Sequence, residues 1–452
     1  MGRKVFISFL GTNNYVECRY KFNEAVSEPV RFVQEALIAQ LCKDWTEKDR
    51  ILIFCTSLET TGNRGSKEIN WFDNQLDNSE IIGLKRRLEE LRNNTNIKPS
   101  VEEFDIVPGF SEEEIWSVFN AVYHQLKPAD EIYFDVTHAF RSIPLFSVVL
   151  FNYSKYMIGT QLRTIMYGAF EKLGSTAEVR KMSVDKRVVP IIDLTNIARL
   201  QEYNQIASGL KNFGKIKPLE SVINKSITSD SEKVISELGA SISELDEYIN
   251  TIDLKKIKKG LYIKKFRLNY RRVKGRNSFV SPINRILDEL YKETEDFVDE
   301  DSFQNIEVAI NWTIKHDMLM QAFPLAEEYI LLNLANMLKE FKPRSFSSKE
   351  YREFISGILG MSDEDFTTRN WKYTLADYPD VADKISDDFL IIELRPLYDK
   401  IRRARNSLAH GNGSISYEDL KKLIPIIIDS VEHLNAAYTN YPSTQYIIKN
   451  LC

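Results

Sequence analysis

The chain has 452 residues, of which 43% are hydrophobic and 28% charged, and this composition excludes a single small module and a disordered or collagen-like chain. With 60 Lys and Arg against 65 Asp and Glu, the net charge of -5 gives no global attraction to nucleic acid or anionic lipid, so any RNA contact must be local. The cysteines form no C-x-x-C pair, and no stretch approaches the ~18 apolar residues of a membrane helix. We therefore expect a cytoplasmic protein of two or three domains with no membrane partner.

The first 195 residues alternate short β-rich runs with helical patterns, which is typical of a parallel sheet flanked by helices. The predicted strands cover 5–10, 50–55, 101–107, 131–136, 162–167 and 188–193. One helix is expected to begin near Glu28, since Pro29 suits a first helical turn. Another is expected after Ser111, which with Glu114 has the spacing of a capping box. These patterns predict a Rossmann-like α/β domain over 1–195.

Strand signals disappear from about residue 196, and the rest of the chain is predicted to be helical, with a linker region over 196–300 and a helical domain over 301–452. Apolar residues such as Phe323, Ile330 and Leu334 recur at helical spacing and are expected to face a common core. The linker region is rich in cations, which form either a solvated helix face or a track for an RNA backbone. They are Lys255, Lys256, Lys258, Lys259, Lys264, Lys265, Arg267, Arg271, Arg272 and Arg276.

Polar residues follow three of the predicted strands, where ligands bind in open α/β sheets. They are Gly11, Thr12, Asn13, Thr56, Thr137, His138 and Arg141. A helix is expected to begin after Thr137, so its free N–H groups and the Arg141 fork would favour phosphate. In the alternative interpretation, Asp135 and Thr137 only cap that helix and Arg141 is solvated. Together the strand ends predict a pocket for a polar, phosphate-rich ligand.

Common cofactor and metal signatures are missing from the sequence. Neither G-x-G-x-x-G nor G-x-x-x-x-G-K-[ST] occurs, and none of the five histidines lies in an H-E-x-x-H pattern. We therefore expect neither a nucleotide cofactor nor a protein-built metal site.

A second informative segment contains Arg405, Asn406 and His410 after a predicted amphipathic helix. Because Gly411 supplies a helix stop, His410 is expected near a helix end, where a histidine is often only a cap. In the alternative interpretation the three residues are catalytic. His410 can transfer protons near neutral pH, Arg405 can stabilise phosphate and transition-state charge, and Asn406 can position the site.

Several motifs in the first 200 residues resemble the CARF domain of CRISPR-associated ancillary ribonucleases of type III systems. They are Gly11 to Asn13, Asp135 to His138 with Arg141, Tyr167 to Glu171, and Pro190 to Thr195. The resemblance implies a sensor of cyclic oligoadenylate that binds its ligand across a two-fold dimer interface. It favours cyclic tetra-adenylate as activator, with cyclic hexa-adenylate second.

The spacing of Arg405, Asn406 and His410 is similar to the R-x4-6-H motif of HEPN ribonucleases. This resemblance implies metal-independent cleavage of single-stranded RNA, in which the ribose 2'-OH attacks and leaves a 2',3'-cyclic phosphate. One Arg and one His are sparse for a complete site, so two protomers are expected to combine their motifs in a homodimer or higher oligomer. The rival hypotheses are a ligand-responsive nucleic-acid-binding regulator without nuclease activity and an interaction scaffold.

Overall fold

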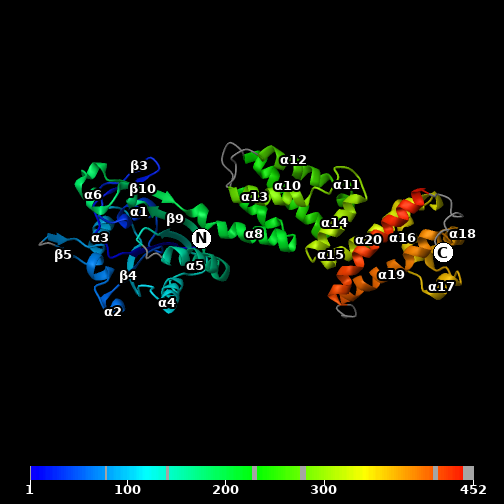
Figure 1. Ribbon diagram of the computed structural model, residues 1–452, viewed down its shortest axis with the longest axis horizontal. Helices are drawn as coiled ribbons and strands as arrows, with labels where there is room; N and C mark the ends of the chain where they lie inside the picture. The colour runs from blue at the N-terminus through cyan, green and yellow to red at the C-terminus, as the bar shows by residue number, and fades with distance from the viewer. Residues whose placement is uncertain are drawn as a thin grey trace. The chain divides into compact units, whose positions relative to one another are not determined.

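The computed structural model describes residues 2–76, 79–138, 142–225, 232–274, 281–410 and 416–440. The chain forms two compact units, Met1–Gln201 and Glu202–Cys452 (Figure 1). We describe each unit by itself.

The N-terminal unit is built on a mostly parallel sheet, with the strand order β3-β2-β10-β9-β8-β1-β4-β7 in the described residues. β9, β8, β1, β4 and β7 run parallel, and β10 pairs antiparallel with β9. The strands are β1 Lys4–Leu10, β2 Arg19–Phe22, β3 Ala25–Val26, β4 Arg50–Thr56, β7 Ser100–Ile106, β8 Glu131–Asp135, β9 Gln161–Gly168 and β10 Val188–Asp193, beside the hairpin β5 Asn74–Leu76 and β6 Ser79–Ile81. The predicted α/β class is confirmed, and all six predicted strands are present.

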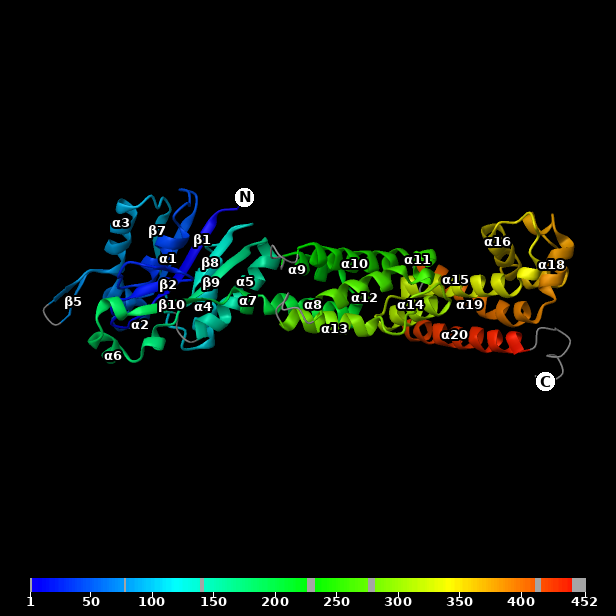
Figure 2. The same ribbon diagram turned by 90° about the horizontal axis from the view of Figure 1, so that it is seen from above.

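Helices cover both faces of this sheet, which is why the central strands β1 and β4 are buried along nearly their whole length. Figure 2 shows the same unit from above. The helices are α1 Val33–Leu41, α2 Leu58–Thr61, α3 Leu84–Asn94, α4 Glu112–Tyr123, α5 Ser142–Ile158, α6 Thr176–Lys181 and α7 Thr195–Ala198, with single turns η1 Lys67–Trp71, η2 Phe170–Leu173 and η3 Val184–Lys186. One core cluster includes Phe6 and Leu37, and the other includes Phe9 and Val118.

Three helix starts were expected in this unit. The described part of the helix expected after Thr137 is α5, from Ser142, because Thr137 and His138 form a turn and 139–141 lie outside the described residues. The Ser111 hydroxyl accepts a hydrogen bond from the Glu114 N–H and caps α4 as predicted. The helix expected near Glu28 begins instead at Val33, because Val30 forms a β-bridge with Cys18. The side chain of Glu35 then accepts the N–H of Phe32 at 2.9 Å and fixes the later start.

The C-terminal unit is helical throughout its described residues. Its helices are α8 Leu200–Phe213, α9 Lys217–Lys225, α10 Glu232–Thr251, α11 Leu254–Lys259, α12 Leu261–Val273, α13 Ser281–Glu293, α14 Gln304–Lys315, α15 Leu319–Met337, α16 Ser348–Leu359, α17 Asp363–Thr367, α18 Pro379–Ser386, α19 Phe389–His410 and α20 Tyr417–Asn440, with turns η4 Lys339–Phe341 and η5 Tyr373–Leu375. One hydrophobic cluster extends from Tyr203 to Val431. The segments predicted as linker and as helical domain therefore share a core, in which α15 packs against both α19 and α20.

Much of the basic charge in the predicted linker region is paired within its own unit. Ion pairs join Lys256 to Asp253, Lys258 to Asp301, Lys265 to Glu244, Arg267 to Asp299 and Arg272 to Glu237. These partners neutralise charge that an RNA backbone would need. The structure thus favours the solvated-face interpretation; Arg276 lies outside the described residues.

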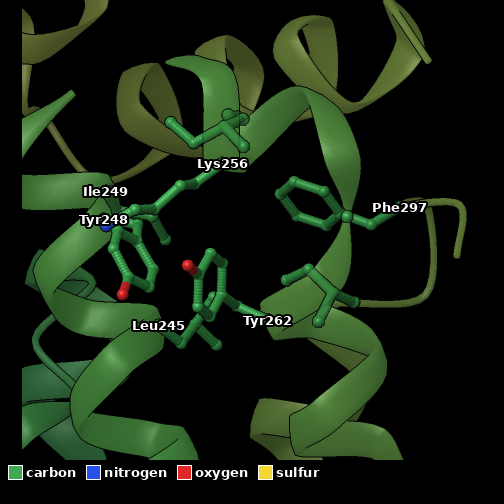
Figure 3. Close-up of a pocket in the computed structure, with 10 residues that line it drawn as sticks. Leu245, Tyr248, Ile249, Lys256, Tyr262 and Phe297 are labelled. Atoms are coloured by element: carbon green, nitrogen blue, oxygen red, sulfur yellow. The ribbon is translucent and has the colours of Figure 1, made fainter. Parts of the chain in front are cut away.

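Lys256 also lies against a small apolar pocket between α10 and α12. Its ammonium lies 4.1 Å from the centre of the Tyr248 ring, and the rings of Tyr248 and Tyr262 are 3.6 Å apart (Figure 3). The cation–π contact and the Asp253 ion pair already satisfy this lysine. The pocket is therefore a packing feature of the helical unit.

Among the described residues, no helix combines the length and the apolar character that crossing a membrane requires.

Candidate functional site

The carboxyl ends of β1 and β8 form the base of a site in the N-terminal unit. Ser8 on β1 pairs in register with Asp135 on β8, and its hydroxyl donates to the Asp135 carboxylate at 2.7 Å. The same carboxylate accepts the Thr137 N–H at 2.9 Å, while Gln34 donates to Ser8 at 3.0 Å. Burial raises the pKa of Asp135, and the hydrogen bonds from Thr137 and Ser8 oppose that rise. Asp135 thus anchors the turn that carries Thr137 and His138.

The rings of His138 and Tyr15 contact each other at this turn, with centres 4.3 Å apart and planes tilted by 44°. The His138 Nε2 atom is buried without a hydrogen-bond partner in the described part of the chain. Burial lowers the pKa of His138 to about 3, so the imidazole is neutral at physiological pH. A neutral ring with an unpartnered buried nitrogen is available to bind an uncharged polar heterocycle.

Gly11 is required beside this pair because of close approach. Its N–H donates to the Tyr15 hydroxyl at 3.0 Å, and a Cβ at position 11 would lie 2.6 Å from that oxygen. Asn70 supports the same loop, since its amide donates to the carbonyls of Gly11 at 2.9 Å and Asn13 at 3.0 Å. The loop after β1 is thereby fixed against η1, which follows β4.

A cleft opens over these two loops, with about 1010 Å³ of empty space including the solvent at its mouth. Aromatic side chains of Tyr15, Tyr167 and Phe170 line it together with the guanidinium groups of Arg31 and Arg180. Arg31 Nε is buried without a partner among the described residues, and burial lowers the pKa of Arg31. Flat rings and guanidinium forks in one cleft fit a ligand that combines bases with phosphates.

The predicted ligand residues have different places around this cleft. Asn13, Thr137 and His138 line it, and the Thr137 hydroxyl accepts the Gly168 N–H at 2.9 Å. Thr12 is exposed and is not among the lining residues. Thr56 is buried, and its hydroxyl accepts the Ser66 N–H at 3.0 Å, so it holds a loop in place. Arg141 lies outside the described residues.

Four further lining side chains, Tyr15, Tyr167, Arg31 and Arg180, were not among the predicted ligand residues. Tyr15 follows the Gly11 to Asn13 motif by two residues, and Tyr167 begins the Tyr167 to Glu171 motif, so these two had a signal in the sequence. Arg31 and Arg180 belong to no motif, and only the folded chain brings them to the cleft.

The second predicted site lies in the helical unit, where α15 packs against α19. Arg405 Nη1 donates to the Glu327 carboxylate at 2.6 Å, and Arg405 Nη2 donates to the Asn406 side-chain oxygen at 3.1 Å. The other Glu327 oxygen accepts the Tyr398 hydroxyl at 3.1 Å. Tyr398 also bonds to the Ser356 hydroxyl at 2.9 Å. A hydrogen-bonded chain from α16 through α19 and α15 thus orients the Arg405 guanidinium.

His410 is the last residue of α19 and is exposed, as is Asn406 one turn earlier. Residues four apart share a helix face, so Asn406 and His410 present their side chains on one side of α19. Glu327 was missed from the sequence although a signal exists. It lies four residues after Phe323 and three before Ile330, and an acidic residue on such an apolar stripe indicates a buried partner.

In the part of the chain that the structure describes, no group of three or more His, Cys, Asp and Glu side chains could hold a metal ion. The exposed polar groups at the end of α19 can transfer protons and stabilise charge.

Comparison with known proteins assigns the N-terminal unit. Residues 5–171 match the family model described as "CRISPR system endoribonuclease Csx1, CARF domain". This unit contains a CARF domain. The chain is also 23% identical over 334 residues to a CRISPR-associated protein of Methanocaldococcus jannaschii, a match covering 65% of this chain and 49% of the relative. The chain spans about half the length of that relative, and both findings support a CARF-containing CRISPR ancillary protein.

Proposed function

We propose that this protein is an endoribonuclease of type III CRISPR defence that cyclic oligoadenylate activates through its CARF domain. The observation that carries the proposal is the Arg405–Glu327 pair. It orients a guanidinium beside Asn406 on the helix that ends at His410, in a chain whose other unit is a CARF domain. The spacing of these residues is similar to the HEPN motif.

The chemistry of the proposed site requires only the substrate's own 2'-OH as nucleophile. Its oxygen forms a bond to the adjacent phosphorus while the bond from phosphorus to the 5'-oxygen breaks. The 2'-OH loses its proton and the departing 5'-oxygen gains one, and His410 serves these transfers. Arg405 stabilises the negative charge that develops on the phosphate oxygens. The products are a 2',3'-cyclic phosphate and a free 5'-OH.

The sensor site would hold the activator by two kinds of contact. Tyr15 and the neutral His138 offer flat faces and a buried ring nitrogen to adenine. Arg31 and Arg180 offer guanidinium groups to the phosphates. Cyclic tetra-adenylate is the first choice of activator and cyclic hexa-adenylate the second. Binding would act on the RNase motif of the other unit by changing the protomer arrangement.

We further propose a homodimer, because one Arg and one His per chain make an incomplete catalytic site. Apolar side chains on α5 suit a contact between CARF domains, since Val149, Tyr153 and Met157 are 62%, 46% and 57% exposed. Single-stranded RNA is the proposed substrate.

The deciding experiment is cleavage of a fluorescent single-stranded RNA by the full chain, with each cyclic oligoadenylate in turn and with or without EDTA. We expect cleavage only with activator, at an unchanged rate in EDTA, and no cleavage of an all-2'-deoxy substrate. Strict Mg²⁺ dependence would contradict the mechanism. Salt-dependent binding of a nucleic-acid duplex, without RNA cleavage, would instead support the hypothesis of a nucleic-acid-binding regulator.

A further inference from the structure

A second cleft lies within the helical unit, beside the helix that carries Arg405. It holds about 1040 Å³ of empty space including open solvent, and residues of α16, α19 and the segment from α17 to η5 line it. Phe354 and Leu375 provide apolar surface, and Ser356 lies in the hydrogen-bonded chain that reaches Arg405. The cleft is therefore part of the same packed region as the proposed catalytic residues.

Tyr373 lines this cleft and is unusual in both its exposure and its backbone conformation. Its side chain is 89% exposed, and its backbone φ of 53° is in the left-handed region that a bulky residue rarely adopts. The flanking residues explain how this conformation is held. Lys372 pairs with Asp365 at 2.6 Å, and Leu375 is buried with Gly357 directly beneath it. A large ring kept in solvent on a strained backbone makes no contribution to the core and points to a binding role.

Arg402 lies in the cleft wall, three residues before Arg405 and therefore about 4.5 Å from it along the helix axis. Among the described residues, Arg402 forms an ion pair with Asp399 at 3.4 Å, which is long for such a pair. Arg403 pairs with the other oxygen of Asp399 at 2.7 Å. The guanidinium of Arg402 is thus loosely held and 40% exposed.

We propose that this cleft binds one nucleotide of the RNA substrate next to the bond that is cut. The base stacks on the exposed ring of Tyr373, and the phosphate on its catalytic side contacts Arg402. Glu353 and Asp365 balance the charges of Arg402 and Lys372 in the lining, so the cleft suits a neutral base with polar edges better than a run of phosphates. The inference rests on the proposed ribonuclease function and names its substrate subsite.

The test measures binding of a labelled single-stranded RNA by fluorescence anisotropy, using activator-bound full chain in a His410→Ala background so that RNA is not cut. Tyr373→Asn accepts the left-handed backbone but removes the ring, and should weaken binding by about 5- to 150-fold. Tyr373→Phe keeps the ring and should bind like the parent. Arg402→Gln should reduce the slope of log affinity against log salt by about 0.7. The matched control is Lys400→Gln, which removes one exposed positive charge from the same helix outside the cleft and should leave affinity unchanged.

The same substitutions in the active protein separate this inference from the proposed function. If RNA is cut but Tyr373→Asn leaves both RNA affinity and KM unchanged, the subsite is refuted while the ribonuclease stands, and the cleft is left to a protein partner. If the parent neither binds nor cuts RNA with any activator, both proposals fail. A raised KM in Tyr373→Asn with normal values in Tyr373→Phe supports the subsite.

Discussion

The carboxylate of Glu327 on α15 holds the guanidinium of Arg405 on α19 at 2.6 Å. The Glu327 side chain is only 9% exposed, whereas that of Arg405 is 40% exposed. One edge of the guanidinium is therefore fixed by a buried anion while the group still reaches solvent. This arrangement orients a cation without burying it, which suits the proposed contact of Arg405 with a substrate phosphate.

Glu327→Gln should lower the rate of activated RNA cleavage by at least about 10-fold, because misplacing an orienting group commonly reduces catalysis by orders of magnitude. The measurement is single-turnover cleavage at saturating RNA and activator. In an Arg405→Ala background the same substitution should have no further effect, since Glu327 acts through Arg405.

The neighbouring acid supplies the control for this prediction. Glu328 on α15 pairs with Arg352 on α16, so Glu328→Gln removes an equal charge from the adjacent position without touching Arg405. Its rate should stay near that of the parent. Equal losses in both variants would mean that Glu327 matters only for packing of α15.

His410→Ala should remove nearly all RNA cleavage, because general acid–base transfer and orientation together contribute several orders of magnitude. Activator binding, measured by calorimetry, should survive because the CARF domain is a separate compact unit. Normal turnover in a folded His410→Ala protein would leave His410 as a helix cap.

The proposed composite site predicts a further result with the same variant. Mixing the parent with excess His410→Ala chains should reduce activity below simple dilution, since each heterodimer lacks one of the paired histidines. Activity that falls only in proportion to dilution would mean that each protomer cuts RNA alone.

The sheet was predictable because its strands are short, β-rich and separated by helical patterns, so local sequence determines them. The start of α1 was not, because the bridge between Val30 and Cys18 depends on a residue 12 positions away. The residues of the candidate sites also divide into those that local sequence reveals and those that only long-range contacts reveal. The motifs gave Thr137, His138 and Arg405, whereas Arg31, Asn70 and Glu327 reach their partners only through tertiary packing. Glu327, 78 residues before Arg405, is the clearest case.

Arg31→Gln should raise the half-maximal activator concentration by about 10-fold or more, because a partly buried guanidinium that binds phosphate makes a strong charge-assisted hydrogen bond. The maximal RNase rate at saturating activator should change little. The control is Lys48→Gln, an exposed cation of the same unit that does not line the cleft. Equal half-maximal concentrations in both variants would place the activator elsewhere.

His138 should make the CARF domain sensitive to acid. Its pKa is lowered to about 3 by burial, whereas an unfolded histidine titrates near 6.5. Between these values only the unfolded state takes up the proton, so stability is lost as pH falls below about 6.5, by up to about 1.4 kcal/mol per pH unit. Hydrogen exchange of β8 amides in urea should reveal this slope, and His138→Gln should flatten it. Parallel slopes in the two proteins would contradict the burial of a neutral imidazole.

Glu307 on α14 should make the helical unit lose stability as the pH rises, the opposite of the pH dependence expected from His138. Burial first, and then the hydrogen bond and charge of Glu432 with the charge of Asp429 on α20, raise the pKa of Glu307 to about 7 from 4.5. The folded state therefore holds a proton that the unfolded state releases. The resulting stability is complete below pH 4.5 and is lost as pH rises through about 7. Discounted for partial exposure, the loss should be about 1 kcal/mol between pH 5 and 8, measured by urea unfolding.

Substitutions can distinguish the pH dependence caused by the proton that Glu307 and Glu432 share from that caused by other acidic groups in the unit. Glu307→Gln keeps the hydrogen bond without a titrating proton, so it should remove the loss of stability above pH 6 and leave stability near pH 4.5 almost unchanged. Glu432→Gln should have the same effect, and the double variant should add nothing, because the two carboxyl groups titrate as a pair. A parent and a Glu307→Gln variant with the same pH profile from 5 to 8 would show that Glu307 is fully ionised in the folded protein.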